Sequence, residues 1–346
     1  IKLLTTTNVN SFDATWNTSN PICNWNDVIM DSEGYIIEIE KGGVGIFGTL
    51  PNTFGATGLS RMIIFRVQDN QLMGSIPASL GSLDALEILW LDDNGFTGTI
   101  PEQIGDASNL EEFWCDNNQL TGGIPNSFLN LVALRDLQIF NNQLDYLPNF
   151  TGSNTNIFQN NAIQCQNNNF TFEDLVPNAS FMNRPNTELY DPQADFTIPP
   201  TANLTTGSTY AIDLGIDADV TDNVYRWTKD GNFLTTITGN NQLDLTPVTF
   251  ADAGIYCCTV TNPQLPLLTL TSSCQTISVT CGTSTGLVDD TVCSGGFITI
   301  NGTDYGDPAA GFPRTGTEDV PEPDQYGCDS IVEIDLTIAG SMPTFF

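Results

Sequence analysis

The sequence predicts a mainly β protein that consists of a repetitive solenoid, a β-sandwich and a small C-terminal β module. Three observations lead to this fold class. Asparagines recur every 24 residues, at Asn70, Asn94, Asn118 and Asn142. Short alternating segments separated by turn residues begin near residue 196, a pattern typical of sandwiches. The last 65 residues contain further strand-like segments between two cysteines.

Each of the four asparagines lies in a common frame of apolar residues. Apolar side chains precede the asparagine by eight, five and three positions and follow it by two. In the second copy these residues are Leu86, Leu89, Leu91 and Phe96 around Asn94. A fixed period in the twenties with the pattern L-x-x-L-x-L-x-x-N is typical of leucine-rich repeats, which stack into a solenoid. We expect about six turns within residues 16–175, with Val44 in the asparagine position of an irregular first turn.

The segment before the repeats carries N-P-I-C-N-W-N-D-V and resembles the N-terminal cap of plant-type leucine-rich repeats. Such a cap normally has a second cysteine, where this chain has Met30. Cys23 therefore lacks its usual partner. The resemblance implies a cap that relies on packing of Trp16, Trp25 and Val28 over the first turn.

The alternating segments of the second unit contain two diagnostic motifs. Trp227 lies in Y-R-W-T-K-D-G, and Tyr256 and Cys258 lie in D-A-G-I-Y-C-C. These motifs resemble those of immunoglobulin-like domains, in which a corner tyrosine stands two residues before a cysteine. The resemblance implies an immunoglobulin-like β-sandwich over residues 196–281. Residues 176–195, rich in turn residues, are expected to be a capping loop and linker.

The spacing of the cysteines limits their pairing. Cys115 and Cys165 occupy the same apolar strand position two turns apart, roughly 10 Å, which exceeds disulfide reach. We therefore expect both to be core residues. On the strand of the second unit, Cys258 faces inward and Cys257 outward. A cross-strand bond from Cys257 to Cys274 is expected, which leaves Cys258 buried and unpaired.

Cys293 and Cys328 bracket the last unit, residues 282–346, and are the natural disulfide pair there. This unit resembles the small β modules that end surface proteins of Bacteroidetes, and the combination of three units implies a protein of that secreted, modular type. The same resemblance marks Thr291 and Ser330 as O-glycosylation candidates. Candidate N-glycosylation sites, in a host that performs the modification, are Asn17, Asn149, Asn169, Asn178, Asn203 and Asn301.

The composition disfavours several classes of partner and of catalytic site. A net charge of −32 disfavours nucleic acid and anionic membranes as partners and favours cations or a basic partner. The absence of histidine removes Ser-His and Cys-His nucleophile systems, so we expect a non-enzymatic protein without a cofactor. The loop Asp213–Asp222 could hold Ca²⁺ through oxygen ligands, although solvated turn residues are the simpler interpretation. No apolar run could span a membrane, and the cysteines suggest an extracellular setting.

Residues four and two before each asparagine are expected on the exposed, concave face of the solenoid. The candidate ligand-binding residues there are Arg66, Trp90, Asp92, Trp114, Asp116, Gln138 and Phe140, which we call the concave strip. Two tryptophans on successive turns should lie about 5 Å apart. Exposed tryptophan is costly unless something covers it. The strip therefore predicts a carbohydrate- or peptide-binding surface; alternatively, the tryptophans only stack on each other or are covered by the chain itself.

Assembly is the other functional hypothesis. Residues 1–15 predict an extended segment that belongs to no repeat, and residues 282–346 form a thin core for an independent module. A spare strand and an incomplete sheet suit β-strand addition between copies, which would propagate into a filament. The leading prediction is thus a structural or adhesive extracellular surface protein, a filament subunit; the alternative is a receptor or adhesin that binds its ligand on the concave face.

Overall fold

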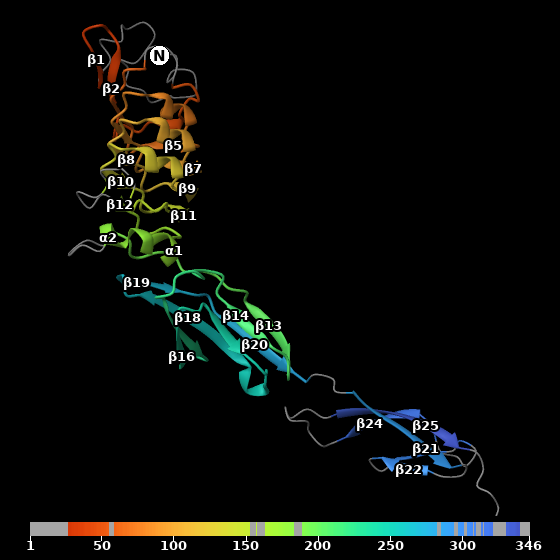
Figure 1. The fold of residues 1–346 in the computed structure, drawn as a ribbon. Helices are drawn as coiled ribbons and strands as arrows, with labels where there is room; N and C mark the ends of the chain where they lie inside the picture. The colour runs from red at the N-terminus through yellow and green to blue at the C-terminus, as the bar shows by residue number, and fades with distance from the viewer. Residues whose placement is uncertain are drawn as a thin grey trace, which may run out of the picture.

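A computed structural model gives the structure of the protein, which is mainly β (Figure 1). The described residues are 27–54, 59–152, 157, 163–182, 189–281, 285–293, 297–300, 303–306, 308, 313, 315–320 and 330–339. Several sequence-based expectations concern residues outside these ranges: the segment 1–15, Trp16, Asn17, Cys23, Trp25, Asn301 and Cys328.

One strand from each turn of the solenoid contributes to a seven-stranded sheet, which confirms the repeat prediction. In spatial order the strands are β1 (Val28–Met30), β2 (Ile36–Glu40), β4 (Ile64–Arg66), β6 (Ile88–Trp90), β8 (Glu112–Trp114), β10 (Asp136–Gln138) and β12 (Ile163–Gln164). β1 is antiparallel to β2, and the other neighbours are parallel. Because equivalent residues pair directly, Trp90 lies beside both Arg66 and Trp114.

A second sheet and a row of short helices complete each turn. The sheet contains β3 (Phe47–Thr49), β5 (Gln71–Gly74), β7 (Gly95–Gly98), β9 (Gln119–Gly123) and β11 (Gln143–Tyr146), and the 3₁₀ helices are η2 (Ala78–Ser82), η3 (Glu102–Asp106) and η4 (Asn126–Asn130). The turns stack so closely that a Cβ on Gly81 would lie 1.7 Å from the backbone oxygen of Gln103. Only glycine fits that position.

The repeating asparagines satisfy the backbone between turns. Asn118 shows the pattern: its Nδ2 donates to the carbonyls of Leu91, Cys115 and Asp116, and its Oδ1 accepts the N–H of Phe96, all within 2.9–3.0 Å. An asparagine amide has the two donors and the acceptor that this position requires. Val44 takes the position in the first turn and is 49% exposed. Cys115 and Cys165 are buried and free, as expected.

The solenoid continues one rung beyond the six expected turns. Gln193 accepts the N–H of Asn168 and of Phe170, and it donates to the carbonyls of Cys165 and Tyr190. It therefore takes the role that asparagine has in the other turns. The repeat pattern placed residues 176–195 in a loop and linker because neither an asparagine nor the apolar frame marks this rung.

Short helices lie between the last turns: α1 (Phe172–Leu175), η5 (Val176–Asn178) and α2 (Ala179–Met182). Thr171 and Asp174 form a reciprocal capping box at the start of α1. Asp217, from the following β unit, is 1% exposed and accepts the N–H of Glu173 at 2.7 Å. This bond joins the end of the solenoid to the unit that follows it.

Asp174 predicts a pH dependence of solenoid stability. Burial raises the pKa of its carboxyl from 3.8 to about 6, against the lowering effect of its bonds to Thr171. Because the folded pKa lies above the unfolded value, this contribution is fully present below pH 3.8 and is lost as the pH rises through about 6. Asp174→Asn keeps an acceptor oxygen but does not titrate. We therefore expect its free energy of unfolding, relative to that of the parent, to increase by about 1–3 kcal/mol between pH 5 and pH 7.

Urea unfolding of the parent and the variant at both pH values measures this difference. Other buried carboxylates contribute equally to both proteins, so their contributions cancel when the two are subtracted. The exposed Asp145→Asn variant is the control and should show the same pH dependence as the parent. An Asp174→Asn variant that tracks the parent at both pH values would contradict the assignment.

The second β unit contains two sheets. The six-stranded sheet runs β13 (Thr201–Thr205), β20 (Gln275–Thr280), β18 (Gly254–Asn262), β15 (Val224–Lys229) and β16 (Asn232–Thr238), with β19 (Leu265–Thr271) also paired to β18. β14 (Tyr210–Asp213) pairs with β17 (Gln242–Leu245), and η6 (Phe250–Asp252) precedes β18. Between β19 and β20, an irregularity at residues 272–274 shifts the pairing along β18.

The cysteines of this unit lie at that irregularity. Cys257 and Cys274, the cross-strand pair expected from the sequence, form a disulfide with a Cα–Cα distance of 4.5 Å. Cys258 is 1% exposed and free. Its neighbour across the sheet is Trp227, which is fully buried.

The C-terminal residues form a three-stranded sheet in the order β21 (Thr285–Cys293), β25 (Ser330–Ala339) and β24 (Thr315–Val320), and a hairpin of β22 (Phe297–Ile300) and β23 (Thr303–Gly306). Cys281 is disulfide-bonded, which the sequence pattern did not predict. The expected Cys293–Cys328 bond stays a prediction.

Candidate functional site

The concave strip begins with a stack of three planar groups on successive turns. The rings of Trp90 and Trp114 lie 3.9 Å apart and 5° from parallel. The Arg66 guanidinium lies 4.0 Å from the Trp90 ring centroid on the next turn, and it forms an ion pair with Glu40. We call Arg66, Trp90 and Trp114 the aromatic stack. Direct pairing of equivalent residues in the parallel sheet produces it.

Charged side chains hold the aromatic stack in place. Trp90 Nε1 donates to Glu112 Oε2 at 3.2 Å. Arg135 binds Glu112 at 2.6 Å and Glu111 at 2.9 Å. Both tryptophans are half-buried, so part of each side chain remains accessible. The stack is thus a preorganised surface rather than a set of loose rings.

Gln138 and Phe140 extend the strip over the following turn. Gln138 pairs with Trp114 in the parallel sheet, and its Nε2 lies 3.4 Å from Asp136 Oδ1. Phe140 is half-buried. The structure therefore places Gln138 beside the stack, and the ligand-binding role of the strip stays a prediction.

The two aspartates of the strip differ from the expectation. Asp92 and Asp116 were expected on the exposed face but are only 8% and 4% exposed. The chain turns after each strand, with Asp93 at φ 50 and Asn117 at φ 52. Burial, and then neighbouring carboxylates, raise the pKa of Asp92 to about 6 and that of Asp116 to about 7.

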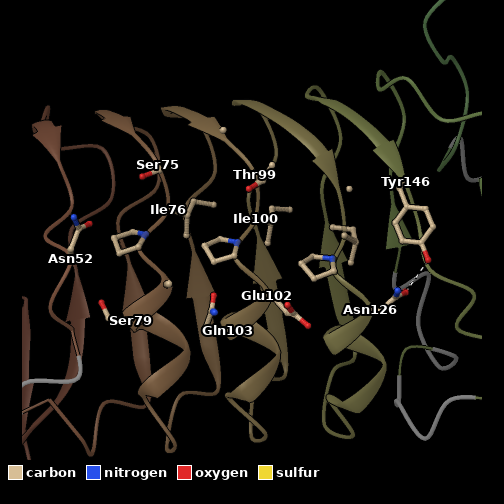
Figure 2. A pocket seen from close by; sticks show the side chains of 17 residues that line it. Asn52, Ser75, Ile76, Ser79, Thr99, Ile100, Glu102, Gln103, Asn126 and Tyr146 are labelled. Carbon is tan, nitrogen blue, oxygen red and sulfur yellow. Dashed lines mark hydrogen bonds between the residues drawn. The ribbon is translucent and has the colours of Figure 1, made fainter.

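A groove on another face of the solenoid was not predicted. It has a volume of about 1090 Å³ and runs between the second sheet and the 3₁₀ helices (Figure 2). The repeated Ile-Pro pairs line it, and Tyr146 closes one end, where its hydroxyl donates to Asn126 at 2.8 Å. The recurrence of these pairs marked the repeat register, and the same signal could have indicated a continuous groove.

The loop Asp213–Asp222 does not gather a set of metal ligands. Asp213 instead accepts the N–H of Gly215 and the Nε2 of Gln242, both at 2.8 Å. Within the part of the chain that the structure describes, one group of three carboxylates lies close enough to hold an ion: Asp92, Asp93 and Asp116.

The glycosylation candidates fall into three classes. Asn149, Asn169 and Asn203 are exposed. Asn178 is fully buried, so this candidate is wrong: its Oδ1 accepts the Phe150 N–H and its Nδ2 donates to the carbonyls of Pro148 and Asp174. Thr291 and Ser330 lie on β21 and β25. Among the described residues, no helix is long and apolar enough to cross a membrane.

Comparisons with known proteins concern the solenoid. The Leucine Rich Repeat family model matches residues 85–107 and 109–131, the two turns that carry Trp90 and Trp114. No curated protein matches the chain.

Similar solved structures are plant receptor ectodomains. The BIR2 ectodomain from Arabidopsis thaliana is 27% identical over 38% of this chain and 71% of that chain, with a TM-score of 0.35. The leucine-rich-repeat ectodomain of the Arabidopsis thaliana receptor kinase GASSHO1/SCHENGEN3, solved in complex with CASPARIAN STRIP INTEGRITY FACTOR 2, is 26% identical over 56% of this chain and 22% of that chain, with a TM-score of 0.43. A Pollen Receptor Kinase 3 structure is 25% identical over 48% of this chain and 80% of that chain, with a TM-score of 0.42.

Proposed function

We propose that this protein is a non-enzymatic, extracellular recognition protein that binds an extended basic peptide, or such a segment of a larger protein, on the concave strip. The observation that carries the proposal is the aromatic stack of Arg66, Trp90 and Trp114. Tryptophan and arginine are the residue types that dominate binding energy at protein interfaces. A stack held by ion pairs loses little freedom when a ligand binds, which favours affinity.

The geometry of the stack favours a peptide over a carbohydrate. A sugar would stack on an open ring face, but one face of Trp90 lies against Trp114 and the other lies under Arg66. On its other side Trp114 pairs with Gln138 in the sheet, and both tryptophans are only half-buried. An apolar surface beside an amide group suits the alternating side chains and backbone groups of an extended peptide.

The charge around the stack favours a basic peptide. Glu40, Glu112 and Asp136 stand beside it on the same sheet. The whole chain has 41 acidic and 9 basic residues. A field of this sign attracts cationic partners and repels acidic ones.

The modular context is part of the proposal. We infer that residues 196–281 are an immunoglobulin-like domain, supported by the buried Trp227 and by the Tyr256 hydroxyl, which donates to the Asp252 carbonyl at 2.8 Å in the manner of a tyrosine corner. The Cys257–Cys274 disulfide supports an extracellular location. The likeness to modular surface proteins of Bacteroidetes, and filament assembly through the segment 1–15, stay predictions from the sequence.

A peptide array tests the proposal. The full chain is probed against peptides of graded net charge. Trp90→Ala/Trp114→Ala is expected to lower the affinity for its basic binders by about a hundredfold to a thousandfold, because such anchors contribute roughly 2 kcal/mol each. Circular dichroism checks that the variant is folded.

The matched control is Tyr146→Ala, which removes the aromatic residue of the groove. It should leave peptide capture unchanged. If Tyr146→Ala lost peptide capture and Trp90→Ala/Trp114→Ala kept it, the binding site would lie in the groove and not on the concave strip. Selective capture of acidic peptides would contradict the charge assignment.

A further inference from the structure

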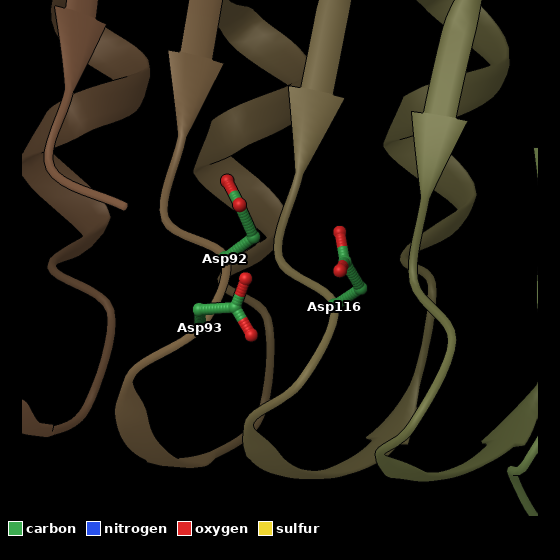
Figure 3. Close-up of side chains that lie close together, drawn as sticks. All are labelled: Asp92, Asp93 and Asp116. Carbon is green, nitrogen blue, oxygen red and sulfur yellow. The ribbon is translucent and has the colours of Figure 1, made fainter. Parts of the chain in front are cut away.

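Three carboxylates on neighbouring turns converge beside the aromatic stack. Asp92 and Asp93 follow β6, and Asp116 follows β8 on the next turn (Figure 3). One oxygen from each of the three lies within 4.8 Å of the others. The same spacing arises when carboxylate oxygens surround one ion at 2.3–2.6 Å.

Two of these carboxylates are buried and carry an oxygen without a partner. Asp92 Oδ1 and Asp116 Oδ1 have no hydrogen-bond donor, although their side chains are 92% and 96% buried, the complement of 8% and 4% exposure. The neighbouring charges that act on Asp92 are those of Asp93 and Asp69, and all are negative. A buried anion without a partner is costly, so the structure stabilises this arrangement poorly on its own.

On two other turns, the residue at the position equivalent to Asp92 and Asp116 also has a side-chain oxygen without a hydrogen-bond donor. Gln68 precedes Asp92 by one turn, Gln166 lies two turns beyond Asp116, and the buried Oε1 atom of each also has no donor. The remaining Asp116 oxygen, Oδ2, accepts from Asn117 Nδ2 at 2.8 Å. That bond ends a chain of amides in which Asn167 donates to Asn141 and Asn141 to Asn117. One turn earlier the equivalent of Asn117 is Asp93, which has no proton to donate.

We propose that Asp92, Asp93 and Asp116 bind a divalent cation of the Ca²⁺ type. All three ligands are hard oxygen atoms, which Ca²⁺ and Mg²⁺ prefer over softer metals. Three carboxylates on two separate turns, with the remaining positions filled by water, suit the flexible coordination of Ca²⁺ better than the strict octahedron of Mg²⁺. Asp93 is exposed and gives a small ion access, whereas the buried Asp92 and Asp116 are out of reach of a bulky ligand. The site does not depend on the peptide proposed for the aromatic stack.

Calcium titration by calorimetry on the full, metal-stripped chain tests the site. We expect one site with a dissociation constant of roughly 10⁻⁴–10⁻³ M, the range of extracellular calcium modules. Asp92→Asn/Asp116→Asn should weaken it by at least tenfold. Terbium offers a second readout, because an ion bound here lies beside Trp90 and Trp114 and should emit when tryptophan is excited; the variant should lose this emission.

Two further variants make the test decisive. Asp93→Asn changes only the exposed ligand. Because the equivalent residue of the next turn is already an asparagine, Asn117, this variant should keep the fold while its calcium affinity falls. Asp84→Asn/Asp106→Asn removes two exposed charges elsewhere on the solenoid and should leave binding unchanged. Calcium binding that is absent from the parent, equal in all variants, or lost only with Asp84 and Asp106 would overturn the proposal.

Discussion

Replacing Asn118 with alanine is expected to destabilise the solenoid by about 2–4 kcal/mol, since a buried group that loses its partner costs roughly 1–3 kcal/mol. The substitution removes four hydrogen bonds, three from Nδ2 and one to Oδ1, that hold its own turn together and join it to the preceding turn. The carbonyls of Leu91, Cys115 and Asp116 and the N–H of Phe96 then need other partners. Water can replace some of them because Asn118 is half-buried. Urea unfolding followed by circular dichroism measures the change.

The control for this prediction is Asn109→Ala, which makes the same chemical change at an exposed position. Asn109 donates a single hydrogen bond, to the Asp84 carbonyl at 2.7 Å. We expect a loss of no more than about 1 kcal/mol. Equal effects of the two substitutions would show that the ladder of asparagines contributes little to stability.

Trp227→Ala is expected to destabilise the second β unit by about 3–5 kcal/mol, the usual cost of removing a large aromatic side chain from a core. Trp227 is fully buried on β15, beside Cys258 of β18. Tyr225 and Tyr256 are also buried in this unit, so its two sheets would face a large cavity. Scanning calorimetry on the full chain measures the effect, because the transition of this unit should shift while that of the solenoid stays.

Trp227→Phe separates packing from hydrogen bonding at the same position. The indole Nε1 of Trp227 has no hydrogen-bond partner in the structure. Phenylalanine keeps an aromatic ring and removes that unsatisfied donor, so its cost should be well below that of alanine. A loss as large as that of Trp227→Ala would indicate that the indole N–H has a partner in solution.

The repeats were predictable because their information is local. The spacing of Leu86, Leu89 and Leu91 before Asn94 indicates which side chains face inward and where each turn closes, and parallel stacking then aligns equivalent residues. The position of Trp90 beside Trp114 followed from this register alone. Gln193 escaped detection because glutamine replaces the asparagine of the frame, and its role shows only in the carbonyls that it meets, those of Tyr190 on its own turn and of Cys165 on the preceding turn.

The candidate site could be predicted only in part, because much of it also depends on contacts that form in the folded chain. The strip residues could be assigned to one face, but three-dimensional packing decided that Arg66 covers Trp90, that Asn178 is buried, and that Cys281 is bonded. Asp92 and Asp116 show the difference most clearly. The sequence by itself determined a mainly β protein with a leucine-rich-repeat solenoid and the face on which its tryptophans lie. Only the tertiary structure decided which carboxylates are withdrawn from water and left without a partner, because burial depends on how neighbouring turns close over a side chain.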